Sequence, residues 1–203
     1  LKKIDSNITV SYLPWANIEN ETEILPLSGV SNIKTIMCNE NGYFAIYNSD
    51  RYGFNNPDQE WEQEEIEYLL IGDSYVQGWC VNRPNDIASV LRNLSNKSVL
   101  NLGLGGNGPL IEYAVLKEYL DLNVKKIIWF YFEGNDLKNL AFEKENRILS
   151  NYLDNLNFTQ NLKFRQNEIN ILTIKSIEDV RKKEFKRKFI KFITLRNLRT
   201  SII

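Results

Sequence analysis

A serine stands where a buried strand would deliver it to a sharp turn. Residues 68–71 form the apolar run Tyr-Leu-Leu-Ile, and Gly72, Asp73 and Ser74 follow directly. A strand that ends in this way presents the serine hydroxyl at the rim of a sheet, as nucleophiles are displayed in acyl-transfer chemistry. We expect Ser74 to be the nucleophile. Gly72 and Asp73 would support it, with Asp73 as a buried acid that accepts backbone N–H bonds.

Two further glycine-containing turns follow predicted strands. One is Asn-Leu-Gly-Leu-Gly-Gly-Asn-Gly at 101–108, and the other is Glu-Gly-Asn-Asp at 133–136. Ligands of an open parallel sheet bind outside the carboxyl ends of its strands, so one topology would gather all three turns. The N–H of Gly106 and the side-chain amide of Asn135 could then join the N–H of Ser74 around an oxyanion. Each such donor contributes roughly 3–4 kcal/mol in the transition state.

The chain contains no histidine, so the usual base for such a serine is absent. A serine hydroxyl without a neighbouring base is a weak nucleophile at neutral pH. We therefore expect this chain by itself to be nearly inactive. Two explanations stay open: the base lies in a segment beyond Ile203, or it has been lost. The small predicted sheet and the start at Leu1 favour the first.

Alternating strands and helices are predicted to position these turns. Strands are expected at 65–71, 98–102 and 126–132, and helices at 85–96 and 110–120. This alternation predicts right-handed βαβ units and a parallel sheet. The third strand is almost wholly apolar, which is typical of a central strand buried on both faces. The predicted class is therefore α/β, with the sheet incomplete at the C-terminus.

The segment before the sheet has a different pattern. Runs at 34–38 and 43–47 predict a hairpin, because Asn41 and Gly42 between them suit the positive-φ positions of a tight turn. Residues 52–58 predict an irregular loop. We expect a small β-containing extension over 1–64, followed by an α/β domain over 65–203.

The C-terminal part is predicted to be helical. The pattern from 137 to 203 is helical, with breaks at 155–159 and 175–176, and this part could form a cap over the site. Residues 181–200 hold nine basic residues and one acid. This segment could contact an anionic membrane surface or, as the simpler alternative, form a solvated helix. It carries no nucleic-acid motif beyond its charge.

Overall composition sets few further limits. With 203 residues, 43% hydrophobic and 25% charged, the chain is an ordinary globular sequence of net charge −1. No apolar stretch approaches the ~20 residues of a membrane span. Cys38 and Cys80 are too few for a disulfide framework, lack metal-ligand spacing and leave the compartment open. An extracytoplasmic or membrane-tethered location would follow if an N-terminal segment has been removed; otherwise the cytoplasm is expected.

The three turns together resemble the SGNH (GDSL-type) hydrolase family. Its first block is similar to 72–74, its second to 101–106 and its third to Gly134, Asn135 and Asp136, in the same order. The resemblance covers about 65–140 and is that of the family's N-terminal part, since the Asp-x-x-His block is missing. It implies a flavodoxin-like three-layer fold and a serine ester hydrolase acting on a small acyl group. A glycan O-acetyl ester as substrate is implied by the family alone.

Several alternatives stay open. The same site could transfer the acyl group to a second alcohol, as an O-acyltransferase, or the fold could be a non-catalytic binding module. Residues 103–108 also match G-x-G-x-x-G, and Glu133 lies 25 residues beyond Gly108, which is close to a dinucleotide-binding fingerprint. Asp73 and Asp136 could hold a metal, or Asp136 could cap a helix. The ester chemistry itself requires no metal or organic cofactor.

Overall fold

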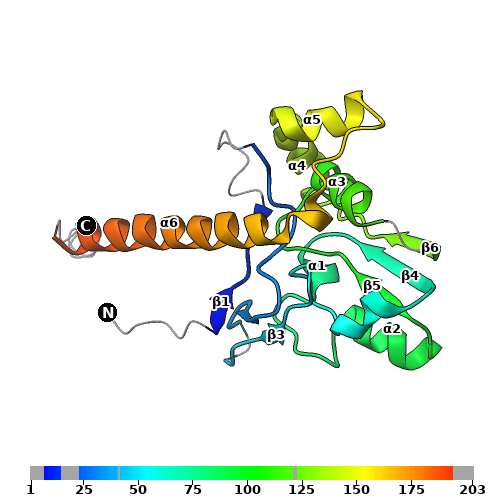
Figure 1. Cartoon of the computed structure of the whole chain (residues 1–203). Coiled ribbons are helices and arrows are strands. Elements are labelled where there is room, and N and C mark those ends of the chain that lie inside the picture. The colour runs from blue at the N-terminus through cyan, green and yellow to red at the C-terminus, as the bar shows by residue number, and fades with distance from the viewer. Residues whose placement is uncertain (1–6, 15–22, 41, 121–122, 194–203) are drawn as a thin grey trace.

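Residues in the middle part of the sequence form a three-stranded parallel sheet (Figure 1). The computed structural model describes residues 7–14, 23–40, 42–120 and 123–193, with the side chains of 189 and 191–193 left undescribed. The strands are β4 (Ile66–Ile71), β5 (Val99–Asn101) and β6 (Val124–Trp129), in the order β5-β4-β6. Leu69 in the middle strand pairs with Leu100 on one side and with Ile127 on the other. The α/β class expected from the sequence is confirmed.

Helices cover both faces of this sheet. Leu70 packs in one cluster with Ala88 of α2 (Ile87–Ser95), whereas the adjacent Leu69 belongs to the main core with Ile111 of α3 (Pro109–Tyr119). The connection through α2 leads from β4 to β5, and the connection through α3 returns past β4 to β6. Because such crossovers are right-handed, connections in opposite directions place their helices on opposite faces.

Local sequence signals set the ends of these helices. The Asp86 side chain accepts a hydrogen bond from Ser89 N at 3.0 Å and caps the start of α2. The same helix ends at Asn96, whose φ of +52° is left-handed. Pro109 occupies the first turn of α3, where a missing N–H is tolerated. Both predicted helices are confirmed to within two residues of their ends.

The N-terminal part forms a second small sheet. Its strands are β1 (Ile8–Val10), β2 (Lys34–Ile36) and β3 (Ile46–Asn48); β1 is parallel to β2, and β2 is antiparallel to β3. The predicted hairpin is thereby confirmed, while its turn residue Asn41 lies outside the described residues. The predicted irregular loop leads into the 3-10 helix η2 (Asp58–Glu62).

This N-terminal part shares the core of the parallel sheet. The main cluster joins residues of β4 and β5 to Ile24, Leu25, Leu27, Phe54 and Trp61. Asp50, bonded to one of these residues, is fully buried and accepts hydrogen bonds from Asn56 Nδ2 and Trp61 Nε1. Burial raises the pKa of Asp50 to about 6 although these bonds oppose the shift.

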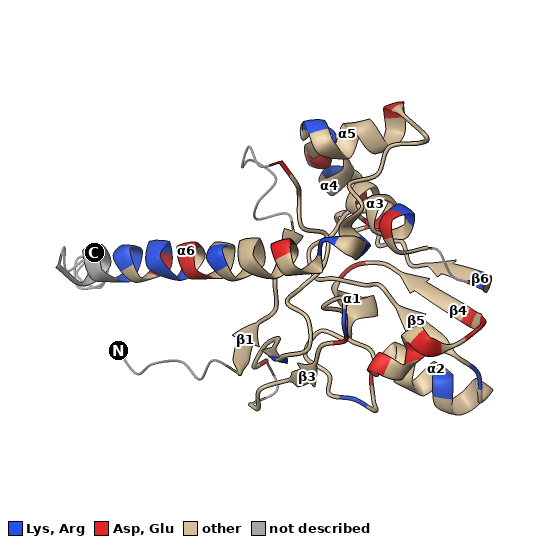
Figure 2. Cartoon of the chain, in the orientation of Figure 1, with Lys and Arg blue, Asp and Glu red and all other residues tan. Residues whose placement is uncertain are grey.

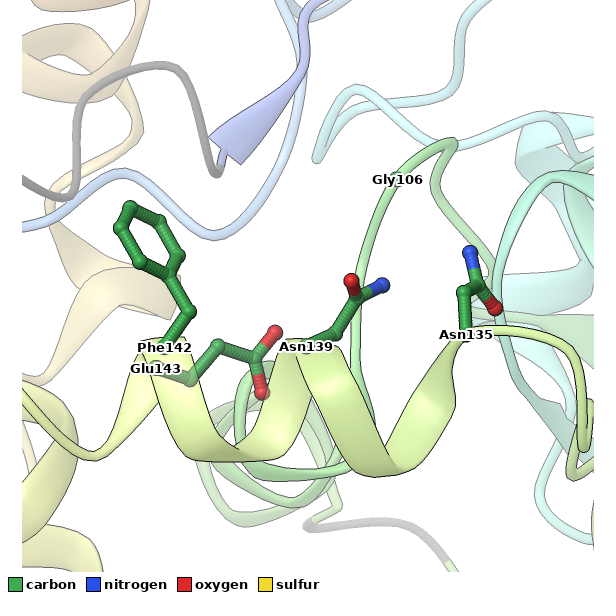
Figure 3. A pocket seen from close by; sticks show the side chains of 5 residues that line it. All are labelled: Gly106, Asn135, Asn139, Phe142 and Glu143. Carbon is green, nitrogen blue, oxygen red and sulfur yellow. The ribbon is translucent and has the colours of Figure 1, made fainter.

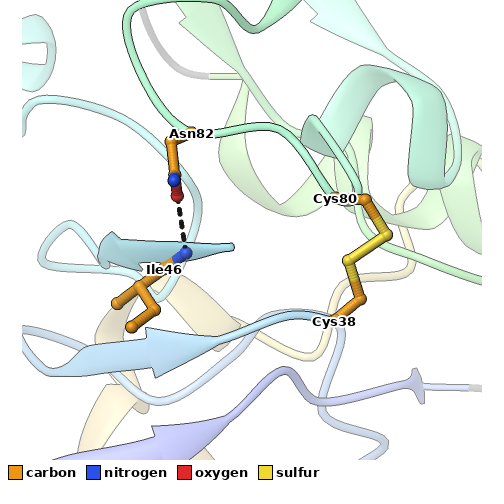
Figure 4. The surroundings of a disulfide bond; sticks show 4 residues. All are labelled: Cys38, Ile46, Cys80 and Asn82. Carbon is orange, nitrogen blue, oxygen red and sulfur yellow. Dashed lines mark hydrogen bonds between the residues drawn. A yellow bond between two sulfur atoms is a disulfide. The ribbon is translucent and has the colours of Figure 1, made fainter. Parts of the chain in front are cut away.

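A disulfide ties the hairpin to the segment that follows β4. Cys38, beyond β2, is bonded to Cys80, which follows the short helix after β4 (Figure 4). Close by, the Asn82 side chain accepts a hydrogen bond from Ile46 N at 2.8 Å. The sequence left the state of both cysteines open, and the structure joins them across a separation of 42 residues.

The position of the third parallel strand differs from the prediction. β6 lies at an edge of the sheet and ends at Trp129, although a central strand over 126–132 was expected. Ile127 is 46% exposed and Trp129 is 43% exposed. The difference has a geometric cause: β4 takes the middle place, and its ladder with β6 stops where β4 itself stops, at the pair Ile71 and Trp129.

Helices form the C-terminal part, as the sequence predicts. They are α4 (Asp136–Glu143), α5 (Arg147–Asp154), the 3-10 helix η3 (Leu162–Phe164) and α6 (Gln166–Ile193). The expected break at 155–159 is confirmed. The break expected at 175–176 is wrong, because α6 runs through it and the sequence 166–193 offers no Gly or Pro to end a helix.

The last helix projects from the body of the molecule (Figure 1). Ile169 and Thr173 are buried, and Asn170 Nδ2 donates a hydrogen bond to Ser31 Oγ at 2.9 Å, so the N-terminal turns of α6 are anchored. Beyond Val180 most described side chains are exposed, and basic residues predominate (Figure 2). None of the described helices is long and apolar enough to cross a membrane. A membrane contact was one prediction for residues 181–200, and the last part of this segment, 194–200, lies outside the described residues.

Candidate functional site

Ser74 is the first residue of a short helix that directly follows the central strand. The chain leaves β4 at Ile71, turns at Gly72 and Asp73, and enters α1 (Ser74–Gln77). Asp73 is buried, and its Oδ1 accepts a hydrogen bond from Tyr75 N at 2.9 Å. A Cβ at position 72 would lie 2.5 Å from Val76 Cγ2, so glycine is required by space there. The turn therefore holds the half-buried Ser74 at the end of the sheet.

The loop after β5 is fastened to this helix. Asn101 donates from Nδ2 to Val76 O at 2.6 Å, and its Oδ1 accepts from Gly103 N at 2.8 Å. Gln77 Oε1 accepts from Gly105 N at 2.8 Å. Neither Gln77 nor the side chain of Asn101 was assigned a role from the sequence. Together they hold the glycine loop against the turn that carries the serine.

Gly106 is distinguished within that loop by an N–H that has no acceptor among the described residues. From 103 to 112 every other backbone N–H has an acceptor, and Pro109 carries no N–H. The N–H of Ser74 likewise meets no acceptor among the described residues. Gly106 has a φ of +77°, a left-handed conformation that favours glycine. Two of the three expected oxyanion donors thus have no acceptor within the described part of the chain.

Asn135 and Asp136 lie at the start of α4, after β6. Asn135 occupies the cap position without a side-chain capping bond, and its Oδ1 is buried without a partner among the described residues. Asp136 lies one residue further on, so it is not the cap itself, and its Oδ2 accepts from Phe132 N at 2.6 Å. Gly134 lies in the exposed loop before them. The rings of Tyr75 and Phe132, 5.5 Å apart, bring this loop to α1.

A cavity of about 300 Å³ lies beside these loops (Figure 3). It is lined by Gly106, Asn135, Asn139, Phe142 and Glu143. The cavity therefore unites two of the expected site residues with three from α4 that were not predicted. Ser74, Gly72, Asp73, Gly134 and Asp136 are not among its lining residues.

The carboxylate of Glu143, from α4, lies at the N-terminus of α3. Its oxygens accept from Gly108 N at 2.6 Å, Leu110 N at 2.9 Å and Ile111 N at 3.3 Å. In a dinucleotide site these are the donors that would hold the pyrophosphate. Because a carboxylate of the chain already uses them, the geometry argues against the dinucleotide alternative. Burial raises the pKa of Glu143 to about 7, in spite of the three N–H donors.

A second buried carboxyl lies near it on α3. Glu112 is 1% exposed; its Oε2 accepts from Trp129 Nε1 at 2.6 Å, and its Oε1 has no partner among the described residues. Burial, together with the charges of Asp136, Asp73 and Glu143, raises its pKa to about 8. Burial likewise raises the pKa of Asp136. Within the described ranges, no three or more acidic, cysteine or histidine side chains form a group suited to a metal ion.

Comparisons with protein-family models, with curated proteins and with solved structures give no match.

Proposed function

We propose that Ser74, Gly106 and Asn135 form an acyl-transfer site for a small ester, with Ser74 as the nucleophile. The observation that carries the proposal is the pair of unused backbone N–H groups, at Ser74 and Gly106, in two loops fastened to each other. Backbone donors that the fold leaves unbonded are what an oxyanion requires. Asn135 makes no side-chain capping bond, and its Nδ2 would supply the third donor.

The strand order supports this location. If the strands of the parallel sheet are counted along the chain, the order β5-β4-β6 is 2-1-3, the beginning of the flavodoxin-like order. We propose the flavodoxin-like three-layer fold on this basis. In that fold ligands bind at the switch point between the first and third strands. Here these strands are β4 and β6, which lead to Ser74 and Asn135.

The chemistry follows from these positions. Ser74 Oγ forms a bond to the carbonyl carbon of the ester, and the carbonyl oxygen takes up negative charge between the three donors. Collapse expels the alcohol and leaves an acyl group on Ser74. Water then releases the acid, or a second alcohol takes up the acyl group, so hydrolysis and O-acyl transfer share this site. The hydroxyl proton must be accepted by a base.

None of the 203 residues is a histidine, so the chain has no imidazole side chain to serve as this base. An external base should therefore increase the activity of the chain. The test is acetylation of Ser74 by 4-nitrophenyl acetate with and without added imidazole, followed by intact-protein mass and peptide mapping. We expect imidazole to accelerate the labelling of Ser74. Ser74→Ala, at the same imidazole concentration, corrects for labelling at other nucleophiles.

The oxyanion donors are tested in the same assay. Asn135→Ala should slow the imidazole-dependent acetylation of Ser74 roughly 100-fold, the usual cost of losing one such donor. Leu137→Ala, on the exposed side of the same helix, serves as the matched control and should leave the rate unchanged. The proposal would be overturned if Ser74 acetylation were independent of imidazole, or if Asn135→Ala and Leu137→Ala reacted equally.

A further inference from the structure

The outer half of α6 carries a dense cluster of positive charge. Residues 181–188, here called the basic segment, contain six Lys or Arg and a single acid. Their net charge is +5, whereas the whole chain has a net charge of −1, so the rest of the chain is acidic. Figure 2 shows this charge on the part of α6 that projects from the body. A surface of one sign in an otherwise acidic chain indicates an anionic partner.

The fold holds the basic segment away from the body. Ile169 and Thr173 are buried and anchor the start of α6, and the helix projects from there away from the sheets (Figure 1). At a rise of about 1.5 Å per residue, Arg181 and Lys188 lie about 12 and about 22 Å beyond Thr173 along the helix axis. Charges in salt solution are screened over about 8 Å. The basic segment can therefore approach an anionic surface while much of the acidic body stays beyond the range of repulsion.

The cations of the basic segment are accessible to a ligand. All six belong to exposed residues. Arg181, Lys183 and Lys186 have no carboxylate partner among the described residues, whereas the other three pair with acids of the same helix. Glu184, the one acid of the segment, is shared by two of the cations. Ion pairs between exposed side chains contribute little, so the phosphate groups of a ligand can replace these carboxylates.

An exposed aromatic ring lies among these cations. Phe185 is 66% exposed, and it follows Arg181 by four residues and precedes Lys188 by three, which places the three on one face of the helix. Lipid headgroups supply phosphates for the cations, and the acyl chains beneath them supply an apolar layer for the ring. The backbone of a nucleic-acid duplex offers phosphates without such a layer. The combination of ring and cations therefore favours a lipid surface.

We propose that the basic segment of α6 docks on the surface of an anionic lipid membrane, with Phe185 inserted at the level of the headgroups between Arg181 and Lys188. Because the segment takes no part in the candidate site, this docking is independent of the proposed acyl transfer. The attraction is electrostatic, so binding requires anionic lipid and weakens as the salt concentration rises.

Co-sedimentation of the whole chain with lipid vesicles tests this contact. Vesicles of phosphatidylcholine with about one third phosphatidylglycerol are compared with vesicles of phosphatidylcholine alone, at low and at physiological salt. We expect binding to the mixed vesicles only, and weaker binding at the higher salt. Arg181→Gln should weaken binding about fivefold, the usual contribution of one basic residue. Phe185→Ala should weaken it about tenfold, because the ring would no longer be buried among lipids. Lys138→Gln, which removes an exposed lysine of α4, is the matched control and should bind like the unchanged chain.

The variants separate a membrane from other anionic partners. Weaker binding by both Arg181→Gln and Phe185→Ala supports docking of the cations and the ring together. The proposal is overturned if the chain binds neither kind of vesicle or both equally, or if Arg181→Gln and Lys138→Gln bind equally. Unchanged binding by Phe185→Ala also overturns it, because the contact would then involve phosphates alone. Duplex DNA at the same phosphate concentration is added as a competitor; if it displaces the chain from the vesicles, the partner is a nucleic acid and the membrane proposal fails.

Discussion

Glu112 should make the stability of the chain depend on pH in the neutral range. The burial of its carboxyl, with one oxygen bonded to Trp129 Nε1 and the other without a partner, raises the pKa from 4.5 to about 8. In the unfolded chain the group loses its proton near pH 4.5, and in the folded chain it holds the proton until about pH 8. Between these values the folded state binds more protons, so the free energy of unfolding falls as pH rises.

The size of the effect follows from the shift. Each pKa unit corresponds to ~1.4 kcal/mol, so a shift of this size would contribute up to ~5 kcal/mol over the whole window. The contribution is fully present below pH 4.5 and is lost as pH rises through about 8. Glu112→Gln keeps an oxygen for Trp129 and replaces the neutral carboxylic acid with a neutral amide. The variant should therefore resemble the unchanged chain in mild acid and become relatively more stable in mild base.

Urea unfolding at about pH 5.5 and pH 8.5, followed by tryptophan fluorescence, measures this difference. Asp50 also has a raised pKa, and its contribution is common to both proteins, so it cancels in the comparison. Glu67→Gln is the matched control: Glu67 pairs with Lys126 at the surface, which lowers its pKa, so it titrates below this window. The reasoning about Glu112 is refuted if the difference in unfolding free energy between Glu112→Gln and the unchanged chain is the same at both pH values, within about 0.5 kcal/mol.

Two further predictions concern the frame of the site. Cys38→Ser should lower the free energy of unfolding by about 4 kcal/mol, because the lost crosslink to Cys80 spans 42 residues. Reductant should produce the same loss in the unchanged chain and none in the variant. Equal stability of the unchanged chain with and without reductant would contradict this prediction. Gly72→Ala should lower the free energy of unfolding by ~1–3 kcal/mol, because its Cβ would meet Val76 Cγ2 at 2.5 Å. Thermal unfolding measures this loss, Val76→Ala in the same chain should restore part of it, and an unaltered midpoint in Gly72→Ala would disprove the contact.

The fold could be predicted as far as local patterns determine it. Apolar runs and helical spacing identify β4, β5, α2 and α3, and an Asn-Gly pair identifies the hairpin, because each signal lies within one element. The place of β6 could not be predicted in this way. Its apolar side chains indicate a strand, but the order of strands depends on two crossovers, and these leave Ile127 and Trp129 at an exposed edge.

The residues of the candidate site likewise fall into two groups: those that local motifs indicate, and those that only long-range contacts identify. Ser74, Gly106 and Asn135 were suggested by short motifs at the ends of strands. Glu143 was not, because it contacts Gly108 across 35 residues, and Gln77 was not, because it contacts Gly105 across 28. The only sequence signal for Glu143 was its four-residue spacing from Asn139 on a predicted helix, which is typical of many helices.

These long-range contacts determine which N–H groups of the glycine loop remain without an acceptor among the described residues. By sequence, a loop with four glycines before a helix offers its N–H groups equally to an oxyanion or to a phosphate. In the structure Gln77 takes the N–H of Gly105, and Glu143 takes those at the start of α3. What is left in this loop is the single N–H of Gly106, which has no acceptor among the described residues. A phosphate needs several converging donors, and a loop with one remaining N–H does not provide them, so these contacts argue against phosphate binding here and are compatible with the proposed oxyanion role.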